Sequence, residues 1–238
     1  MTHPPGNYQL VVVDNPEALA QRCAEAIATT IDLALAERDR CQIALAGGTT
    51  PGACYRLLGR EHLPWERVDV LLGDERWVSA DDPASNCRLL RETLQATGPG
   101  SEARLHPVPT QLPKPEQGAE AYEATLRQLC GGDPPRLDLV LLGLGEDGHT
   151  ASLFPQTDAT RVQDRAVTVG MGKGLPRISL TAPALCAARH VLFMVSGSGK
   201  SQALKRLMDP SESSERTPAR LVQPSTPVRI FADRAAAA

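Results

Sequence analysis

Short apolar runs recur along the chain, and most of them end in glycine and polar residues. A continuous aliphatic run of this length is typical of a strand buried on both faces of a sheet. The strands that the pattern predicts lie at residues 8–13, 42–46, 68–72, 137–143, 167–169, 178–181, 190–195 and 228–231. Helical patterns separate them, near residues 15–35, 50–58, 82–88, 116–129 and 201–208. This alternation predicts an α/β fold, a three-layer α/β/α sandwich around a mostly parallel sheet.

Residues that favour helix caps mark where three of the helices are expected to begin. Asn15 and Thr50 are each followed by a proline, the residue preferred at the first helical position. Asp82 is expected to open the third helix. By contrast, the segment 209–217 has the composition of a mobile loop, and the alanine-rich end at 235–238 is expected to fray.

Composition narrows the class of protein. With 42% hydrophobic and 22% charged residues, a chain of 238 residues has enough core for one compact domain, expected over residues 1–238. A net charge of -3 favours neither a nucleic-acid partner nor a membrane surface. The six cysteines contain no C-x-x-C pair, which indicates reduced thiols. The opening MTHPPGNYQL lacks the features of a signal peptide, and no apolar run approaches the ~20 residues of a membrane span, so we expect a cytoplasmic protein.

The first polar cluster, Gly47-Gly48-Thr49, lies between a predicted strand and a predicted helix. Glycines let a backbone approach a ligand, and the free N–H groups at a helix start attract anions, so this loop suits a phosphate. A tight turn with a threonine cap and no ligand explains the same residues, and both interpretations stay open.

A second cluster, Asp74-Glu75-Arg76, follows the strand at 68–72. Arg76 could hold a phosphate through its bidentate guanidinium, while the acids orient it or bind sugar hydroxyls. The alternative is an ordinary surface ion pair.

The turn SGSGKS contains the last residues of a phosphate-binding P-loop. That motif needs a glycine where this chain has Met194, inside a strand, so the P-loop interpretation fails. Lys200 is still a cation at the start of a helix, after a glycine-rich turn, and suits a single phosphate.

The segment LGLGEDGH, residues 142–149, matches the dinucleotide fingerprint G-x-G-x-x-G. Two carboxylates in this loop would repel a pyrophosphate, and no acidic residue follows at the distance needed for a ribose, so we do not expect NAD. Asp147 and His149 instead suit proton transfer, because an adjacent carboxylate orients an imidazole. A metal site is not expected, since these two residues have no identifiable third ligand.

Together these motifs resemble a known family. The segments AGGTTP (46–51), GDERWV (73–78), SNCR (85–88), LDLVLLGLGEDGHTASLFP (137–155), RISLTAP (177–183) and SGSGK (196–200) resemble the 6-phosphogluconolactonases of the glucosamine-6-phosphate isomerase/6-phosphogluconolactonase family, in the family's order and over nearly the whole chain. The related deaminases carry a glutamate five residues after the histidine of their DGH turn, where this chain has Phe154. A deaminase or isomerase, and a non-catalytic sugar-phosphate sensor, remain the alternatives.

The resemblance implies a modified Rossmann-like sheet that binds no nucleotide, and hydrolysis of a small sugar-phosphate lactone without a cofactor. It implies that His149 activates water beside Asp147. It implies that Arg76, Lys200 and the loop Gly47-Gly48-Thr49 hold the phosphate. Further substrate contacts, oxyanion donors among them, are expected from Asp74, Asn86, Arg88 and Arg177. The oligomeric state stays open.

Overall fold

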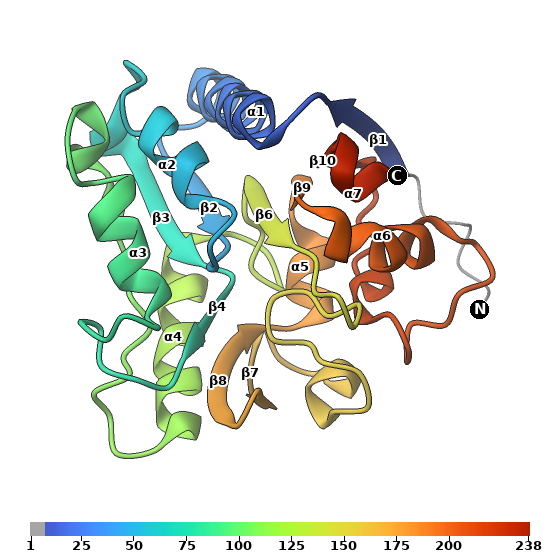
Figure 1. Ribbon diagram of the computed structural model, residues 1–238. Coiled ribbons are helices and arrows are strands. Elements are labelled where there is room, and N and C mark those ends of the chain that lie inside the picture. Colours follow the sequence, from blue (N-terminus) through green and yellow to red (C-terminus); the bar gives the residue numbers. More distant parts are fainter. Residues whose placement is uncertain (1–7) are drawn as a thin grey trace.

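A computed structural model describes residues 8–238. Within that range a seven-stranded sheet forms the middle layer, and all of its strands are parallel (Figure 1). Its order is β1-β10-β9-β6-β2-β3-β5. The strands are β1 (Tyr8–Val13), β2 (Cys41–Leu45), β3 (Val68–Leu72), β5 (Arg104–Leu105), β6 (Leu139–Gly143), β9 (His190–Val195) and β10 (Val228–Asp233). The apolar runs therefore predicted the main strands and their parallel arrangement correctly.

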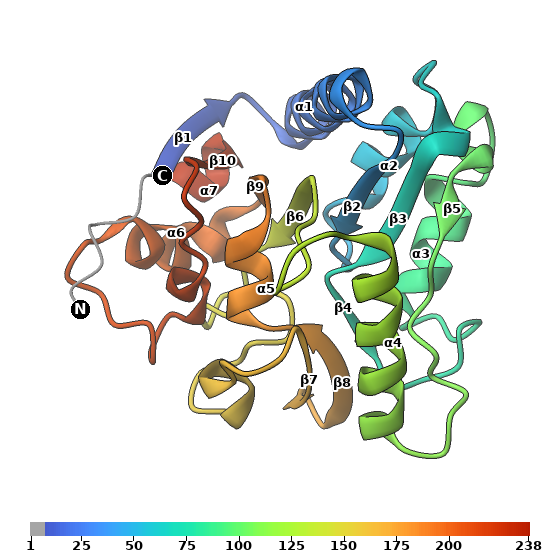
Figure 2. The same ribbon diagram turned by 180° about the vertical axis from the view of Figure 1, so that it is seen from behind.

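Helices cover both faces of this sheet. Figures 1 and 2 show α1 and α2 on one side and α4 and α5 on the other, so the three-layer prediction is confirmed. The α-helices are α1 (Pro16–Glu37), α2 (Gly52–Leu58), α3 (Asn86–Thr93), α4 (Pro115–Leu129), α5 (Ala182–Ala187), α6 (Ser201–Met208) and α7 (Arg234–Ala237). Short 3-10 helices are η1 (Trp65–Arg67), η2 (Pro99–Glu102), η3 (Asp158–Arg161), η4 (Ser198–Lys200) and η5 (Pro218–Leu221).

The order of the strands creates a crevice. From β2 the chain moves to β3 and β5 on one side, and then returns to place β6 on the other side of β2. At such a switch point the loops after the two strands run in opposite directions and leave a gap at the carboxyl ends, where ligands bind in open α/β sheets. The loops that begin at Ala46 and Leu144 flank this gap.

A second, three-stranded antiparallel sheet lies beyond the carboxyl ends of the first. Its order is β4-β8-β7, with β4 (Asp74–Arg76), β7 (Val167–Gly172) and β8 (Leu175–Leu180). The cluster after β3 is therefore a strand, although the sequence predicted only a polar turn there. The expected strands at 167–169 and 178–181 exist and form one longer hairpin. Pairing with β8 makes β4 a strand, and a partner so distant in sequence leaves no local pattern.

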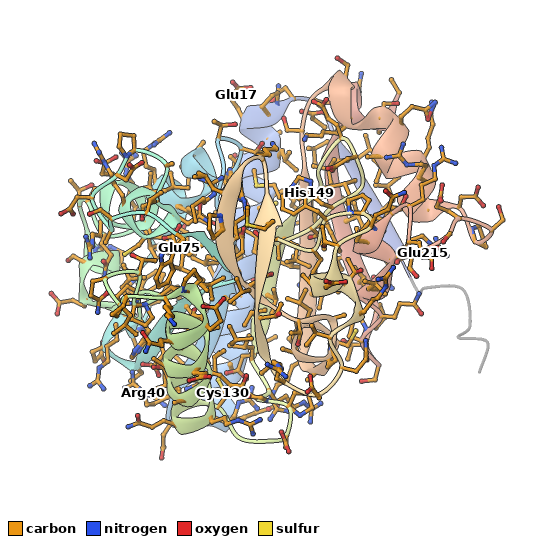
Figure 3. The ribbon with its side chains drawn as sticks, turned by 90° about the horizontal axis from the view of Figure 1, so that it is seen from below. Glu17, Arg40, Glu75, Cys130, His149 and Glu215 are labelled. Atoms are coloured by element: carbon orange, nitrogen blue, oxygen red, sulfur yellow. The ribbon has the colours of Figure 1, made fainter. Side chains whose placement is uncertain are left out.

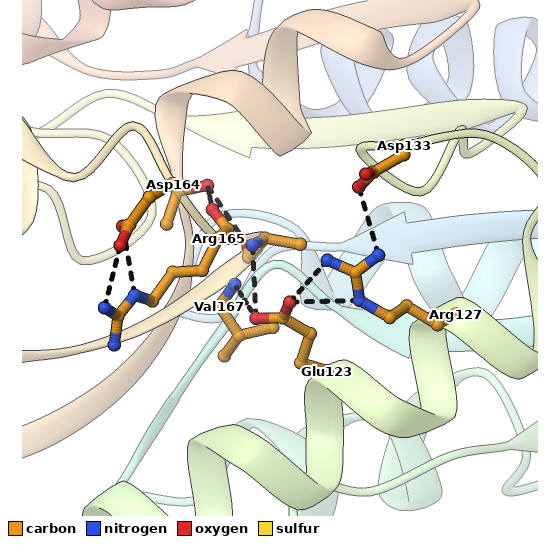
Figure 4. A network of polar contacts seen from close by, with 8 residues as sticks. Glu123, Arg127, Asp133, Asp164, Arg165 and Val167 are labelled. Carbon is orange, nitrogen blue, oxygen red and sulfur yellow. Dashed lines mark hydrogen bonds and ion pairs between the residues drawn. The ribbon is translucent and has the colours of Figure 1, made fainter.

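Helix α4 fixes the base of the β7–β8 hairpin. The carboxylate of Glu123 accepts hydrogen bonds from the backbone N–H groups of Ala166 (3.2 Å) and Val167 (3.1 Å). Arg127 bridges this carboxylate to Asp133, at 2.9 Å and 3.0 Å (Figure 4). Because its base is held in this way, the hairpin presents its tip and β8 to the crevice in a defined position.

Two of the three helix caps differ from the prediction. Asn15 caps α1 as expected, accepting from the N–H of Ala18 at 2.8 Å. Thr50 does not cap α2: Pro51 has helical dihedral angles, and no side chain caps this helix. Helix α3 begins at Asn86 rather than near Asp82, because the hydroxyl of Ser85 accepts from the N–H of Arg88.

The end of the chain also differs from the prediction. The carboxylate of Asp233 caps α7 by accepting from the N–H of Ala236, and that alanine is 1% exposed, so the expected fraying is wrong. The segment 209–217 is a loop, as expected, and its mobility stays a prediction.

The core lies on both faces of the main sheet. On α1 a stripe of apolar residues is buried, and each Leu or Ile of the stripe contributes about 1.5–3 kcal/mol. Beside the crevice, the hydroxyl of Tyr55 donates to the carbonyl of Ala46 at 2.6 Å and so fixes the loop after β2.

All six cysteines are free thiols. Between residues 8 and 238, no helix combines the length and the apolar character that a membrane span needs. The expectation about a signal peptide concerns residues that lie largely outside the described range.

Candidate active site

A cavity of about 350 Å³ occupies the crevice at the carboxyl ends of β2, β6 and β9. Loops from both sheets line it, so residues distant in sequence share one pocket. Its lining includes these predicted site residues: Gly47, Gly48, Thr49, Asp74, Arg76, Asn86, His149, Arg177 and Lys200. The structure therefore brings these positions, which were selected separately in the sequence, into one pocket.

The glycine loop after β2 has no room for side chains at its first position. A Cβ on Gly47 would lie 1.8 Å from Oδ1 of Asn86, so only glycine fits there. Gly48 has a φ of +97°, in the region that favours glycine. The backbone of this loop is therefore exposed to a ligand, which is the arrangement that anion-binding loops use.

The carboxylate of Glu75 holds Asn86 against this loop. Glu75 is 2% exposed and accepts hydrogen bonds from the N–H groups of Asn86 and Cys87, both at 2.8 Å, and from the Ser85 hydroxyl at 3.0 Å. Burial raises the pKa of Glu75, although these hydrogen bonds act in the opposite direction. Glu75 thus serves the site through Asn86, a role that the sequence analysis missed.

Asp74 brings a buried carboxylate to the cavity wall. Its Oδ2 accepts from the hydroxyl of Ser152 at 2.5 Å, and Nη1 of Arg177 lies 3.8 Å from the same oxygen. The amide of Asn86 donates to the Asp74 carbonyl at 2.7 Å. These contacts tie β4, β8 and the segment after β6 into one rigid wall.

His149 and Asp147 form a hydrogen-bonded pair in the turn after β6. Nδ1 of His149 lies 2.5 Å from Oδ1 of Asp147, and the His149 N–H donates to the same oxygen at 3.1 Å. Partial burial acts to raise the pKa of Asp147, but hydrogen bonds from His149 outweigh it and lower the pKa to about 2. An ionised carboxylate at Nδ1 holds the proton there, so Nε2 is the nitrogen that accepts a proton.

The glycines of this turn make the pair possible. A Cβ on Gly145 would lie 2.0 Å from Nδ1 of His149, and Gly148 has a φ of +89°. From outside, Nη2 of Arg206 donates to the carbonyl of Glu146 at 2.9 Å, and the N–H of Ala219 donates to the Gly148 carbonyl at 3.0 Å. The turn is therefore held on both sides, and Asp147 stays next to the imidazole.

Phe154 fixes the plane of the imidazole. Its ring stacks on that of His149 with centroids 4.2 Å apart and an interplanar angle of 28°. The guanidinium of Arg177 lies over the same ring, 5.4 Å from its centroid. Figure 3 looks at this region from below and labels His149 beside the β7–β8 hairpin.

Two cations come from opposite positions on neighbouring strands. Arg76 on β4 pairs in register with Arg177 on β8, and both line the cavity. Arg76 also donates to the carbonyl of Ala84. Burial lowers the pKa of Arg177, and Asp74 acts in the opposite direction. Like charges directly opposite each other in a sheet destabilise it, so this wall favours an anionic ligand.

Lys200 approaches from the end of β9, through a turn that Asp233 fixes. The Asp233 carboxylate accepts from the hydroxyl of Ser196 at 2.5 Å and from the N–H of Gly197 at 3.1 Å. Burial acts to raise the pKa of Asp233, but these hydrogen bonds outweigh it and lower the pKa. The turn therefore holds Lys200 at the cavity. Lys200 is the last residue of η4 and directly precedes α6.

A family model described as glucosamine-6-phosphate isomerases/6-phosphogluconolactonase matches residues 14–231. The chain belongs to this family. A curated relative from Synechocystis, named 6-phosphogluconolactonase, is 45% identical over 219 residues, 91% of each chain. A relative of the same name from Nostoc is 40% identical over 230 residues, covering 95% of this chain and 96% of the relative. The crystal structure of a 6-phosphogluconolactonase from Shewanella baltica is similar, with a TM-score of 0.86 at 29% identity, covering 96% of this chain and 97% of that one.

Two predicted site residues of this family member do not line the cavity. Asp147 contacts His149 and acts through it. Arg88 lies outside: its guanidinium binds the carboxylate of Glu92 at 2.7 Å and the carbonyl of Asp81 at 2.8 Å. The i,i+4 spacing from Arg88 to Glu92 on α3 is a sequence signal that could have revealed this surface pair.

The cavity also contains residues that the sequence analysis did not select. Lys173, at the tip of the β7–β8 hairpin, and Ser196, at the end of β9, both belong to its lining. Lys173 lies between the two strands predicted at 167–169 and 178–181, and the local sequence gives no sign that this hairpin reaches the crevice. From residue 8 to the end of the chain, no group of three or more His, Cys, Asp or Glu side chains is arranged to hold a metal ion.

Proposed function

We propose that this protein hydrolyses 6-phospho-D-glucono-1,5-lactone to 6-phospho-D-gluconate, the lactonase step of the oxidative pentose phosphate pathway. The observation that carries the proposal is the Asp147–His149 pair beside a cavity that also contains cations and a glycine loop. The names of the relatives at 45% and 40% identity support the same reaction. A cytoplasmic location belongs to the proposal as well.

Phe154 favours hydrolysis over the deaminase reaction of the same family. In the deaminases a glutamate five residues after the DGH histidine serves the ring-opening proton relay. Here that position carries the phenyl ring of Phe154, which stacks on His149. A phenyl ring has no proton to exchange. The remaining chemistry of the turn, a base oriented by a carboxylate, is what ester hydrolysis needs.

In the proposed reaction, Nε2 of His149 takes a proton from water as the oxygen attacks C1 of the lactone. C1 becomes tetrahedral, and the former carbonyl oxygen carries the negative charge. When this intermediate collapses, the carbonyl forms again and the bond from C1 to the ring oxygen breaks. The imidazolium returns its proton to that leaving oxygen, and the new acid ionises. A positioned general base supplies a factor of ~10²–10⁴, and Asp147 stabilises the imidazolium that forms.

The phosphate group is proposed to bind between the glycine loop and Lys200. Gly47, Gly48 and Thr49 line the cavity together with Lys200, and Arg76 adds a guanidinium. Binding of a remote phosphate fixes the reacting carbon against His149 and so lowers the barrier of the chemical step.

The sugar hydroxyls and the carbonyl oxygen are proposed to contact Asp74, Asn86 and Arg177 on the rigid wall of the cavity. Arg88 is not part of the proposal, because its guanidinium is engaged on the outer surface.

Two assays run side by side test this function. Acid release after addition of fresh 6-phosphogluconolactone, corrected for spontaneous hydrolysis, is expected from the purified protein. Ammonia release from glucosamine 6-phosphate is expected to stay at background. Ammonia release without acid release would assign a deaminase instead, and binding of either sugar phosphate without turnover would indicate a sensor.

A further inference from the structure

Lys173 stands at a position where the backbone itself favours another residue. It forms the two-residue loop of the β7–β8 hairpin together with Gly174, with φ angles of +52° and +79°. Loops with both angles positive are of the type I′ class, which prefers asparagine, aspartate or glycine at the first position. A lysine in the left-handed region is conformationally unfavourable, so turn geometry does not explain why it is there.

The charge of Lys173 is available to a ligand. Its side chain lines the cavity, and in the described part of the chain no carboxylate lies within ion-pair distance of it. The two arginines of the same wall differ, because Arg76 donates to a carbonyl and Arg177 lies near Asp74. An ammonium without a partner at the edge of a pocket is well suited to pair with an anion that arrives there.

The packing of the hairpin places the backbone next to Lys173 beside the stacked rings of Phe154 and His149. A Cβ on Gly172 would lie 2.1 Å from Cε2 of Phe154, so β7 is pressed against the ring that stacks on His149. Nε of Arg177 donates to the carbonyl of Gly172 at 3.1 Å and secures the same spot. Lys200 reaches the cavity from a different element, the turn after β9.

Hydrolysis of a lactone changes the charge at C1. The substrate ester is neutral at C1, whereas the tetrahedral intermediate and the product carboxylate each carry a negative charge there. We propose that Lys173 binds the oxygen atoms on C1, pairing first with the oxyanion and then with the carboxylate of the product. This assignment rests on the proposed lactonase function, and it separates the cavity into a phosphate end at Lys200 and a carboxylate end at Lys173.

The test uses two ligands that differ only at C1, namely 6-phosphogluconate and glucitol 6-phosphate, each measured as an inhibitor of lactone hydrolysis and by calorimetry. The variant is Lys173→Asn, which removes the charge and suits the turn, so the hairpin is retained. Lys173→Arg keeps the charge as a control. Lys200→Met serves as the matched change at the phosphate end.

Lys173→Asn is expected to weaken the binding of 6-phosphogluconate about fivefold and that of glucitol 6-phosphate by less than about twofold. It is also expected to lower kcat for lactone hydrolysis. Lys173→Arg stays close to wild type, and Lys200→Met weakens both ligands by a similar factor. Equal weakening of both ligands by Lys173→Asn, or no weakening of either, would overturn the assignment. A wild-type protein that does not hydrolyse the lactone would contradict the proposed function itself, which is a separate result.

Discussion

The rings of His149 and Phe154 stack with their centroids 4.2 Å apart. Phe154 occupies the position where the related deaminases have a glutamate. The contact fixes the plane in which the imidazole meets a ligand. Arg177 reinforces this contact, because its guanidinium lies over the ring of Phe154. The stacking therefore contributes to the orientation of the proposed base rather than to the binding of phosphate.

Replacing Phe154 by leucine keeps an apolar side chain but removes the stacking. Because a stacked aromatic pair is worth about 0.5–1.5 kcal/mol, kcat is expected to fall about fivefold while KM changes little. Steady-state kinetics of lactone hydrolysis provide the measurement. Phe231→Leu, at a buried position on β10, is the matched control. A change in KM alone would argue that Phe154 contacts substrate and does not orient the histidine.

Asp147→Asn is expected to lower kcat about a hundredfold, because an amide at Nδ1 no longer selects the tautomer with a free Nε2. The carboxylate is ionised at all pH values well above 2, so the acid limb of the wild-type pH profile does not report Asp147. Asp164→Asn, an exposed carboxylate paired with Arg165, is the control. A kcat close to wild type would mean that Asp147 does not assist His149.

The same variant has a pH-dependent effect on stability. The pKa of Asp147 is lowered on folding, so its stabilising contribution is complete above the unfolded value of 3.8 and is lost as the pH falls towards 2. Thermal unfolding of wild type and Asp147→Asn should therefore differ near pH 6 and converge near pH 2. The difference is small, because the side chain is 47% exposed. A difference that grows towards low pH would contradict the assignment of this pKa.

Gly47→Ala tests the glycine loop. The added Cβ would lie 1.8 Å from Oδ1 of Asn86, so the loop must move, and KM for the lactone is expected to rise about tenfold or more. Gly131→Ala is the control, since a Cβ there meets no atom within 4 Å. Similar KM values for both variants would show that the loop takes no part in binding.

The sequence predicted β2, β3, β6, β9 and β10 well because these strands are mostly buried and therefore read as apolar runs. It missed β5, which has only two residues and is partly exposed. The boundaries of β3, β9 and α6 match the prediction without a shift. The caps were harder to predict: Thr50 and Asp82 have the right chemistry for an N-cap, but the backbone at Pro51 and the hydroxyl of Ser85 decide where the two helices begin.

Most of the candidate site was predicted because its residues follow strands whose carboxyl ends meet at one edge. Arg88 was expected to contact substrate, but it does not line the cavity, because its guanidinium binds Glu92 on α3. Glu75 and Lys173 required the structure: the first acts through three-dimensional contacts to Asn86, and the second depends on how the hairpin packs on Phe154. Neither relationship leaves a periodic signal in the sequence. The single domain over residues 1–238 stays a prediction.

In the proposed reaction, His149 is the base that activates water. The most direct test of this role is the rate of acid release from 6-phosphogluconolactone by His149→Gln, compared with wild type and with His62→Gln, which changes an exposed histidine. Circular dichroism of each variant checks that the fold is retained. A loss of about 10²–10⁴-fold in kcat is expected for His149→Gln alone. Turnover by folded His149→Gln at the wild-type rate would contradict this role.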